Sequence, residues 1–450
     1  MSTLAEDRDV VDLTQRMIRN QCVNDGTKDS GQEIRTVELL ESFFSGCGVD
    51  LERFEPEPGR ASLLARIPGR DSTAPTLMLM GHTDVVAVNP SSWTRDPFGG
   101  ELIDGWVWGR GAIDMLGQTA SMAVALRRLV KEGWRPRGTL AYLAVADEEA
   151  GGTYGSGWLT EHAPDAVKAD FVLTESGGMA LPLPSTSGPK LPVMVGEKGL
   201  YWYNIRVRGT PGHGSMPRRS GNALVKTAEV VRRIADYRPD TKIQEFWQRF
   251  VESADLPPQM AKTLIDAAAL TSFLETSPDE GLVPMVRAAT QTTFAPTVVH
   301  GGVKTNVIPD TVDLQLDIRS LPGQSAEDVR HQLDQALGDL ASEVEVNTLI
   351  SSESSVSGID TPLWRSVARA TSALAPGATA IPFLLIATSD ARYFRQRAGA
   401  VVYGAGLFSS KISFAEGAKM LHGDDERIDV DSLRLMTEFF QFVAKDLLES

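Results

Sequence analysis

Apolar runs that end in histidine or acidic residues restrict the folds open to this chain. The runs 76–80 (TLMLM), 139–146 (TLAYLAVA) and 171–174 (FVLT) contain no charged residue. Such runs are typical of strands that are buried on both faces, as in a parallel sheet with helices on each side. The segments 9–21 and 118–133 have helical periodicity. Strands and helices therefore alternate, and we expect an α/β fold with a mostly parallel sheet.

A change of pattern in the middle of the chain predicts a second domain. The 450 residues are too many for one ordinary core, and a hydrophobic content of 42% is enough to bury two. Between 196 and 352 the order becomes strand, helix, two strands, helix, strand, which is the ferredoxin-like order, with a helical stretch near 241–290 as an insertion in that domain. Helix 362–376 returns to the α/β pattern. We predict a split catalytic domain, 1–195 and 353–450, with the inserted domain at 196–352.

Charge and composition limit the partners of the protein. A net charge of −15, with no basic stretch that carries aromatic residues, argues against a nucleic-acid surface and favours a small-molecule substrate. The N-terminal segment MSTLAEDRDVVDL has neither a basic nor an apolar region, and no run approaches the length of a membrane span, so we expect a cytoplasmic protein with no membrane partner. Cys22 and Cys47 are too few for a disulfide framework or a thiolate zinc site, although they could pair with each other.

Candidate metal ligands cluster where the predicted strands end. The residues at these ends, together with one before the helix that starts near Gly117, are His82, Asp84, Asp114, Asp147, Glu148, Glu149 and Glu175. Carboxylates crowded at one sheet edge repel each other and raise each other's pKa, so we expect a cation among them. For any single residue a solvated loop acid is the alternative, and for Asp147 that alternative is the better one. His422, in MLHGDDERI, is the candidate for a further neutral ligand.

These residue types suit a pair of ions such as Zn²⁺, each bound by one imidazole and one carboxylate, with a further carboxylate and a water between them. One ion would be bound by His82 and Glu175, and the other by Glu149 and His422. Asp114 would bridge the two ions. Co²⁺ and Mn²⁺ remain open, because histidine and carboxylate ligands suit them too.

Two further residues have predicted roles beside the metals. Glu148 cannot easily bind the same ion as its neighbour Glu149, so we expect it to act as the general base for the water that the ions acidify. Asp84 lies two positions after His82 on the same strand face, where its carboxylate could hold the imidazole in place.

The order and spacing of these motifs resemble a known family. HTDVV (82–86), GRGAIDM (109–115), DEEAGG (147–152), the later Glu175 and the His422 before DER are similar to the di-zinc hydrolases that include aminoacylase, glutamate carboxypeptidase and succinyl-diaminopimelate desuccinylase. The resemblance covers essentially the whole chain, since GTPGHGSMP and NVIPD resemble the lid of that family. It implies a zinc-peptidase α/β domain with helices on both faces, a ferredoxin-like lid that often dimerises, and the same ligand roles.

Within that family, two features narrow the expected activity. A glutamate at the position of Glu175 is typical of members that remove an acyl group or a C-terminal residue, and the tail ATSDARYFRQRAG with its closing MLHGDDERI resembles aminoacylase most. We therefore predict hydrolysis of the amide bond in N-acyl amino acids or small peptides. A dipeptidase or carboxypeptidase is the alternative, followed by a desuccinylase or a non-catalytic binding protein. Leu116-Gly117-Gln118 departs from the Lys-Gly-Gly of many relatives, which puts substrate preference in doubt.

Three residues outside the ligand set have weaker predicted roles. His213, in a glycine-flanked turn, would be a solvated surface group by itself, but the family's lid histidine polarises the scissile carbonyl, often across a dimer. Asn306 could donate a hydrogen bond to substrate, and Arg392 could bind a substrate carboxylate. For both residues a structural role is the open alternative.

Overall fold

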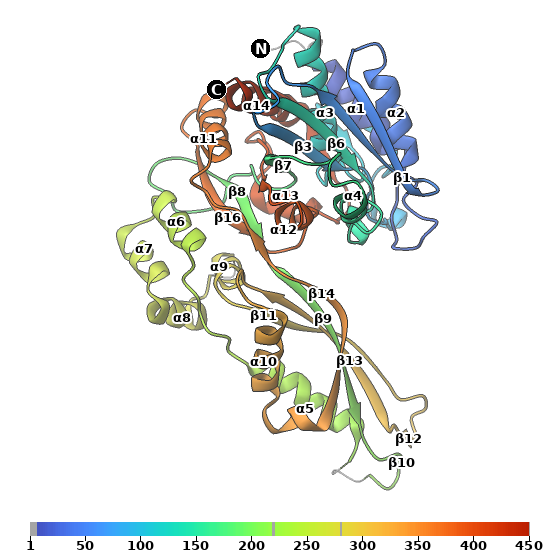
Figure 1. Cartoon of the computed structure of the whole chain (residues 1–450). Coiled ribbons are helices and arrows are strands. Elements are labelled where there is room, and N and C mark those ends of the chain that lie inside the picture. Colours follow the sequence, from blue (N-terminus) through green and yellow to red (C-terminus); the bar gives the residue numbers. More distant parts are fainter. Residues whose placement is uncertain (1–6, 218–220, 280, 450) are drawn as a thin grey trace.

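The computed structural model describes residues 7–217, 221–279 and 281–449. It has a larger body built on a nine-stranded sheet, from which a second sheet extends as an arm (Figure 1). Along the main path of the large sheet the strands lie in the order β1 (Asp50–Glu57), β2 (Arg60–Ile67), β6 (Thr139–Val145), β3 (Thr76–His82), β7 (Phe171–Thr174), β17 (Val401–Gly404), β8 (Lys190–Glu197) and β15 (Ser355–Val356). β16 (Thr379–Leu385) pairs with β8. The central strands β6, β3, β7 and β17 run parallel, as predicted.

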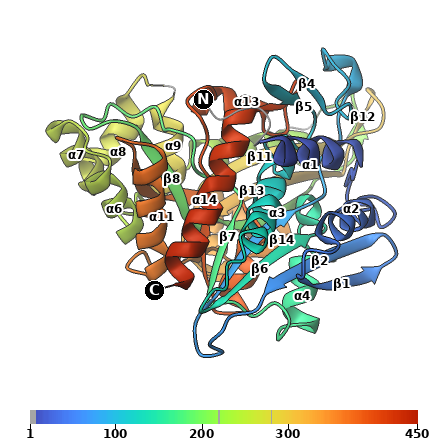
Figure 2. The ribbon, with the colours of Figure 1, turned by 90° about the horizontal axis from the view of Figure 1, so that it is seen from above.

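Helices cover both faces of the large sheet. One face is covered by α1 (Arg8–Arg19), α2 (Ile34–Phe44), α3 (Leu116–Lys131), α11 (Pro362–Leu374) and α14 (Val430–Leu448), with α14, α3 and α1 side by side (Figure 2). The other is covered by α4 (Ser156–His162) and α12 (Ala391–Gln396). Along β3, Leu77 and Leu79 pack on the first face, and Met78 and Met80 on the second. Burial on both faces is the reason for the uninterrupted apolar run.

The arm has the predicted ferredoxin-like arrangement. Its antiparallel sheet has the order β11 (Thr293–Gly301), β13 (Thr311–Ser320), β9 (Gly199–Arg208) and β14 (Val344–Ser352). Two helices, α5 (Ala223–Asp236) and α10 (Ala326–Leu337), share a core with one face of this sheet. The stretch 297–308 is divided between two strands, because the chain turns at Gly302, whose φ of +77° is left-handed. Beyond that turn, β12 (Val307–Ile308) pairs with β10 (Gly212–His213) at the tip of the arm (Figure 1).

The helical stretch that we assigned to the inserted domain packs elsewhere. It comprises α6 (Glu245–Ser253), α7 (Pro258–Ile265), α8 (Ala267–Thr276) and α9 (Leu282–Thr290). Trp247 and Phe250 of α6 belong to the core of the larger body, and the Phe250 ring centroid lies 5.2 Å from that of Phe383 in β16. The apolar face of α6 covers β16, so these helices extend the larger body, whereas the predicted boundaries near 196 and 352 stay a prediction.

A small sheet joins two loops that approach the edge of the large sheet. It consists of β18 (Arg427–Asp429), β5 (Trp106–Trp108) and β4 (Glu101–Ile103), and α13 (Phe414–Met420) precedes β18 in the chain. Because β18 follows His422 and β5 precedes Asp114, their pairing brings these two residues into the same region. Among the described residues, no helix combines the length and the apolar character that a membrane span requires.

Candidate metal centre

Parallel pairing brings the carboxyl ends of three strands to one edge of the large sheet. His82 is the last residue of β3, and β3 lies between β6 and β7. Glu148 and Glu149 lie in the short 3-10 helix that follows β6, and Glu175 directly follows β7. Ligands of open parallel sheets bind at this edge, because the loops that can hold them start there.

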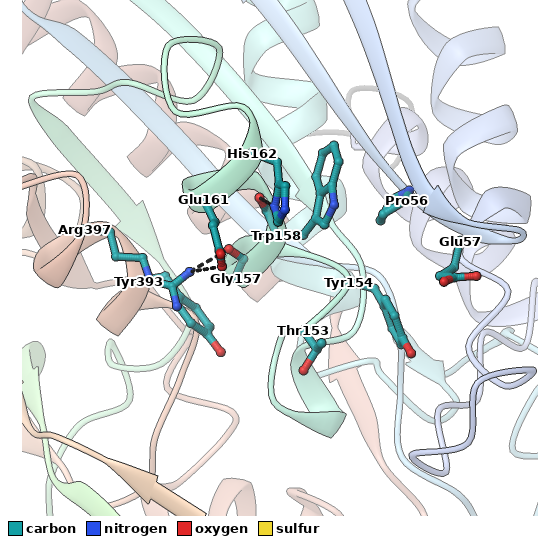
Figure 3. A pocket seen from close by; sticks show the side chains of 10 residues that line it. All are labelled: Pro56, Glu57, Thr153, Tyr154, Gly157, Trp158, Glu161, His162, Tyr393 and Arg397. Carbon is teal, nitrogen blue, oxygen red and sulfur yellow. Dashed lines mark hydrogen bonds and ion pairs between the residues drawn. The ribbon is translucent and has the colours of Figure 1, made fainter.

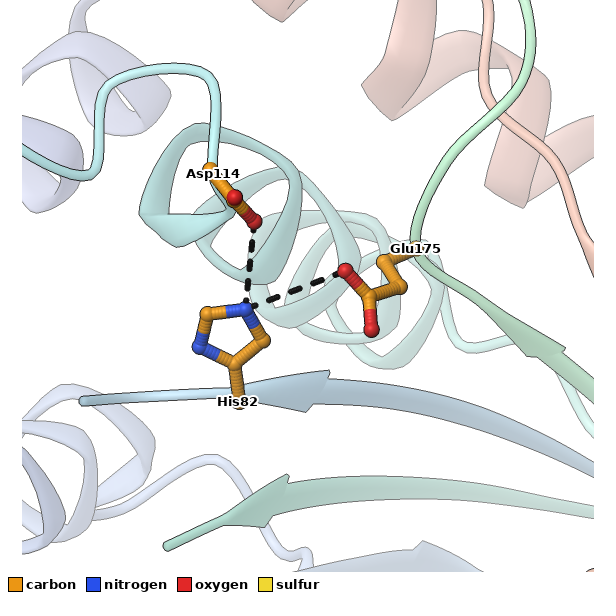
Figure 4. A group of neighbouring side chains, drawn as sticks. All are labelled: His82, Asp114 and Glu175. Carbon is orange, nitrogen blue, oxygen red and sulfur yellow. Dashed lines mark hydrogen bonds and ion pairs between the residues drawn. The ribbon is translucent and has the colours of Figure 1, made fainter. Parts of the chain in front are cut away.

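The first ligand group contains His82, Asp114 and Glu175. Nε2 of His82 lies 3.3 Å from Oδ1 of Asp114 and 3.9 Å from Oε2 of Glu175 (Figure 4). The three side chains come from different segments and point toward one another. Their ligand atoms all lie within 4.8 Å of one another, which is close enough for a common ion.

A second group contains Asp114, Glu149 and His422. Nε2 of His422 lies 3.2 Å from Oδ2 of Asp114 and 3.2 Å from Oε2 of Glu149. Asp114 therefore faces one imidazole with each of its two oxygens. A carboxylate in this position is shared by both groups, as expected for a bridging ligand.

The residues present fit divalent cations. Oε1 of Glu149 is buried and has no hydrogen-bond partner within the described part of the chain, which is costly for a carboxylate unless a cation binds there. Two imidazoles and three carboxylates are ligands that suit Zn²⁺, Co²⁺ or Mn²⁺. Each ion would take one imidazole, one carboxylate of its own and one oxygen of Asp114.

Burial and mutual repulsion shift the pKa values of the three glutamates upward. Burial raises the pKa of Glu175 to about 8. Burial, and then the charge of Glu175, raise the pKa of Glu148 well above its ordinary value. Burial also raises the pKa of Glu149, although its hydrogen bond with His422 opposes this.

The two imidazoles compensate for this crowding. Hydrogen bonds to Asp114 and Glu149 raise the pKa of His422 to about 10. Burial lowers the pKa of His82, but its hydrogen bond to Asp114 and the charges of the neighbouring carboxylates together outweigh burial, so the pKa lies well above its ordinary value. Burial raises the pKa of Asp114, and hydrogen bonds from His422 and His82 reverse the sign, so its pKa is lowered. Without metal, imidazolium groups thus neutralise the carboxylates.

Asp84 contacts both the imidazole of His82 and the turn after β6. Nδ1 of His82 lies 2.9 Å from the backbone oxygen of Asp84 and 3.6 Å from its Oδ1. The carboxylate also accepts the backbone N–H groups of Glu148, at 3.2 Å, and Glu149, at 3.1 Å. That this carboxylate holds the imidazole in place stays a prediction.

Asp147 is not the solvated loop acid that we expected. It is 2% exposed, and its Oδ1 lies 2.6 Å from Nη2 of Arg60, which is itself 1% exposed. A carboxylate buried beside other acids needs a cation, and Arg60 on β2, which also pairs with buried Glu33, supplies it.

A buried ion pair that the motif analysis missed holds the loops of Asp114 and His422 together. Glu426 accepts the backbone N–H groups of Ile113, at 2.7 Å, and Asp114, at 3.0 Å. Arg110 donates to Glu426 at 2.7 Å and to the backbone oxygen of His422 at 3.2 Å. The signal in the sequence was the arginine in GRGAIDM together with the glutamate that closely follows the last histidine in HGDDER.

His213 ends β10 and Asn306 directly precedes β12, and these two strands pair at the tip of the arm, far from β3, β6 and β7 of the larger body (Figure 1). His213 is exposed, and its Nδ1 lies 2.7 Å from Oγ of Ser215. The backbone N–H of Gly214 donates to the backbone oxygen of Asn306 at 2.9 Å. Within one chain the structure does not bring either side chain to the ligand groups.

The guanidinium of Arg392 is engaged by the protein backbone. It donates to the backbone oxygens of Ser389, at 2.6 Å, and Gly151, at 2.8 Å, and the residue is 9% exposed. These bonds tie the loop after Glu149 to the start of α12. Recognition of a substrate carboxylate by Arg392 stays a prediction.

A hollow of about 330 Å³ lies beside α4 (Figure 3). The rings that line it are already covered: Trp158 stacks on His162 with centroids 5.1 Å apart, and the Arg397 guanidinium lies 4.9 Å from the centre of Tyr393. None of the predicted ligands lines it, so the hollow gives no reason to move the candidate site from the sheet edge.

Fold and site together define a metal-dependent hydrolase of amide bonds. The family model described as Peptidase family M20/M25/M40 matches residues 78–446, and the chain belongs to this family. The family relationship inferred from the motifs is confirmed, as are the α/β fold and hydrolase chemistry.

Three comparisons illustrate the relationship. The chain is 29% identical over 394 residues to an N-fatty-acyl-amino acid synthase/hydrolase PM20D1 of Xenopus tropicalis, covering 85% of this chain and 74% of the relative. It is 28% identical over 448 residues to a succinyl-diaminopimelate desuccinylase of Cereibacter sphaeroides, covering 97% and 98%. The crystal structure of the M20 family metallo-carboxypeptidase Sso-CP2 from Sulfolobus solfataricus superposes with a TM-score of 0.75 at 18% identity, covering 98% of this chain and 99% of that one, which shows the shared fold.

Metal loading at pH 7 is expected to release at least about one proton per chain. His422, with a pKa of about 10, and Glu175, with a pKa of about 8, hold protons at pH 7 that they must lose to bind a cation. Metal affinity should therefore fall as the pH is lowered. Titration calorimetry of metal-free protein in buffers of different ionisation enthalpy measures the release. Binding without net proton release would contradict these pKa directions. The matched control is His331→Gln, a histidine exposed on α10.

Proposed function

We propose that this chain hydrolyses the amide bond of N-acyl amino acids with two divalent cations, most simply Zn²⁺, bound by the two ligand groups. The observation that carries the proposal is the position of Asp114, whose two oxygens face His82 and His422 at 3.3 and 3.2 Å. Each imidazole also has its own carboxylate neighbour, Glu175 or Glu149. This arrangement supplies two similar cation sites that share one ligand.

Bound cations lower the pKa of a water molecule and polarise a carbonyl oxygen. The side chain of Glu148 would take a proton from the attacking water and return it to the amide nitrogen as the bond to the acyl carbon breaks. Its pKa is raised by burial and by the charge of Glu175, which suits a group that must both accept and donate a proton. Asp84 orients Glu148 through its backbone N–H.

The choice of N-acyl amino acids over peptides rests on the glutamate at position 175 and on the named relatives. One relative is a hydrolase of fatty-acyl amino acids, and another removes a succinyl group. A dipeptidase or carboxypeptidase is the second candidate, which the name of the structural neighbour Sso-CP2 favours. Co²⁺ and Mn²⁺ are the alternatives to Zn²⁺.

His213 is proposed to act on the substrate of a partner subunit. It is exposed at the tip of the arm, and Asn306 lies beside it. In a homodimer formed through the arm, the tip of one chain could reach the metal centre of the other. There the imidazole would donate a hydrogen bond to the developing oxyanion, and the Asn306 amide would bind substrate.

Glu148→Gln and Glu149→Gln should have different effects. Glu148→Gln removes the proton acceptor, so turnover should fall by roughly 10²–10⁴ while elemental analysis still finds two ions per chain. Glu149→Gln should lose one of the ions. Glu161→Gln, an exposed glutamate on α4, should change neither quantity. The opposite pattern would exchange the roles of the base and the ligand.

A substrate panel tests the proposed class. With the metal-loaded enzyme, kcat/KM should be at least about ten-fold higher for N-acyl amino acids than for dipeptides that match them in side chains, a difference of about 1.4 kcal/mol. Higher values for the dipeptides would favour the peptidase alternative.

Mixing two inactive variants tests the proposed role of His213. His213→Ala should lower turnover by about 10²–10³ with metal content unchanged. A heterodimer of His213→Ala and Glu148→Gln subunits contains one complete site if the histidine acts across the dimer, so activity should return. Verified heterodimers that stay inactive would show that His213 does not act on the partner's site.

A further inference from the structure

The buried side-chain amide of Asn24, from the N-terminal segment, contacts the carboxylates of Asp84 and Asp147 next to the metal centre. Asn24 is 4% exposed, and its Nδ2 donates to Oδ2 of Asp84 at 2.8 Å and to Oδ1 of Asp147 at 3.0 Å. Asp84 in turn accepts the backbone N–H groups of Glu148 and Glu149. Asn24 is thus linked through one side chain, that of Asp84, to the backbone of the proposed base Glu148 and of the proposed ligand Glu149.

The second carboxylate holds the start of the same turn. Asp147 has a left-handed φ of +72°, which lets the chain leave β6 and present Glu148 and Glu149 to the sheet edge. Its Oδ2 accepts the backbone N–H of Tyr154 at 2.9 Å, and its Oδ1 receives Arg60 as well as Asn24. The conformation of the turn therefore depends on where this carboxylate is held.

The amide of Asn24 suits this position because it can serve both acids at once. Its NH₂ group provides one donor for buried Asp84 and one for buried Asp147. Oδ1 of Asn24 accepts the N–H of Gly26 at 3.0 Å and the hydroxyl of Ser30 at 3.2 Å, which fixes the orientation of the amide. The Asn24 side chain thus makes four hydrogen bonds, two as a donor and two as an acceptor.

We propose that Asn24 is a positioning residue for the turn at Glu148 and Glu149, and that it acts through Asp84 and Asp147. The amide keeps the two carboxylates at a fixed separation, and they keep the base and the ligand aimed at the metal centre. The effect on catalysis rests on the proposed function, whereas the effect on the turn does not.

Amide hydrogen exchange tests the effect on the turn without reference to activity. In metal-free Asn24→Ala, a peptide that covers residues 147–151 should exchange faster than in wild type, because the acceptor of two of its N–H groups is no longer held. Asn20→Ala is the matched control, since that amide donates to Oγ1 of Thr36 at 3.1 Å in the same segment. Unchanged exchange in Asn24→Ala would overturn the proposal.

Steady-state kinetics tests the consequence for catalysis. In the metal-loaded enzyme, Asn24→Ala should lower kcat by about 10- to 100-fold, the scale of a small misplacement of catalytic groups, with KM within about two-fold of wild type. Asn20→Ala should change neither constant. A loss confined to KM would contradict a role in positioning the base.

A double variant shows whether Asn24 acts through the base. If it does, adding Asn24→Ala to Glu148→Gln should lower the residual turnover little further, because the group that it positions is already absent. If the two substitutions instead lower turnover by the product of their separate factors, Asn24 does not act through Glu148.

A second variant covers the case in which Asn24→Ala does not fold. Asn24→Ser keeps one donor, so its exchange rate and its kcat should lie between those of wild type and those expected for Asn24→Ala; wild-type values would overturn the proposal. If wild type hydrolyses no amide, the proposed function fails, and the exchange experiment still decides the role of Asn24.

Discussion

Repulsion among carboxylates at one edge of the large sheet is the constraint on which the rest of this site depends. Asp114, Glu149 and Glu175 converge there with their ligand atoms a few ångströms apart, and burial makes their charges more costly. Protonated His82 and His422 offset this in the metal-free state, and the same geometry accommodates two cations. The acids are therefore stable together only because cationic groups are placed among them.

Two buried arginines also compensate acidic residues near this edge of the sheet. Arg60 is shared between buried Asp147 and buried Glu33, and Arg110 pairs with buried Glu426. The Arg110–Glu426 pair also bonds to the backbone of Asp114 and His422, so it both neutralises charge and fixes two loops that carry proposed ligands. Such pairs contribute little net stability but are costly to break, which suits a role in fixing a unique loop conformation.

Local sequence patterns predicted correctly the strands that are buried on both faces. The apolar runs that end at His82, before Glu148 and before Glu175 are strands, because residues buried on two faces leave a clear signature. The helical stretch near 241–290 packs on the larger body through α6, which the sequence did not show, since an amphipathic helix indicates that it packs but not on what. The environment of Asp147 was misjudged, because a loop acid that follows a strand gives no local sign of the buried arginine that it meets.

By itself, the sequence determined the α/β class, the order of the elements and the chemical types available for a metal centre, because periodicity and residue chemistry are local properties. Only the tertiary structure decided that Asp114 faces both imidazoles, that Glu426 holds two loops together, and that Asn24 lies between two carboxylates. Those contacts join residues far apart in the chain, and their distances are set by the packing of whole strands and helices, which no short motif contains.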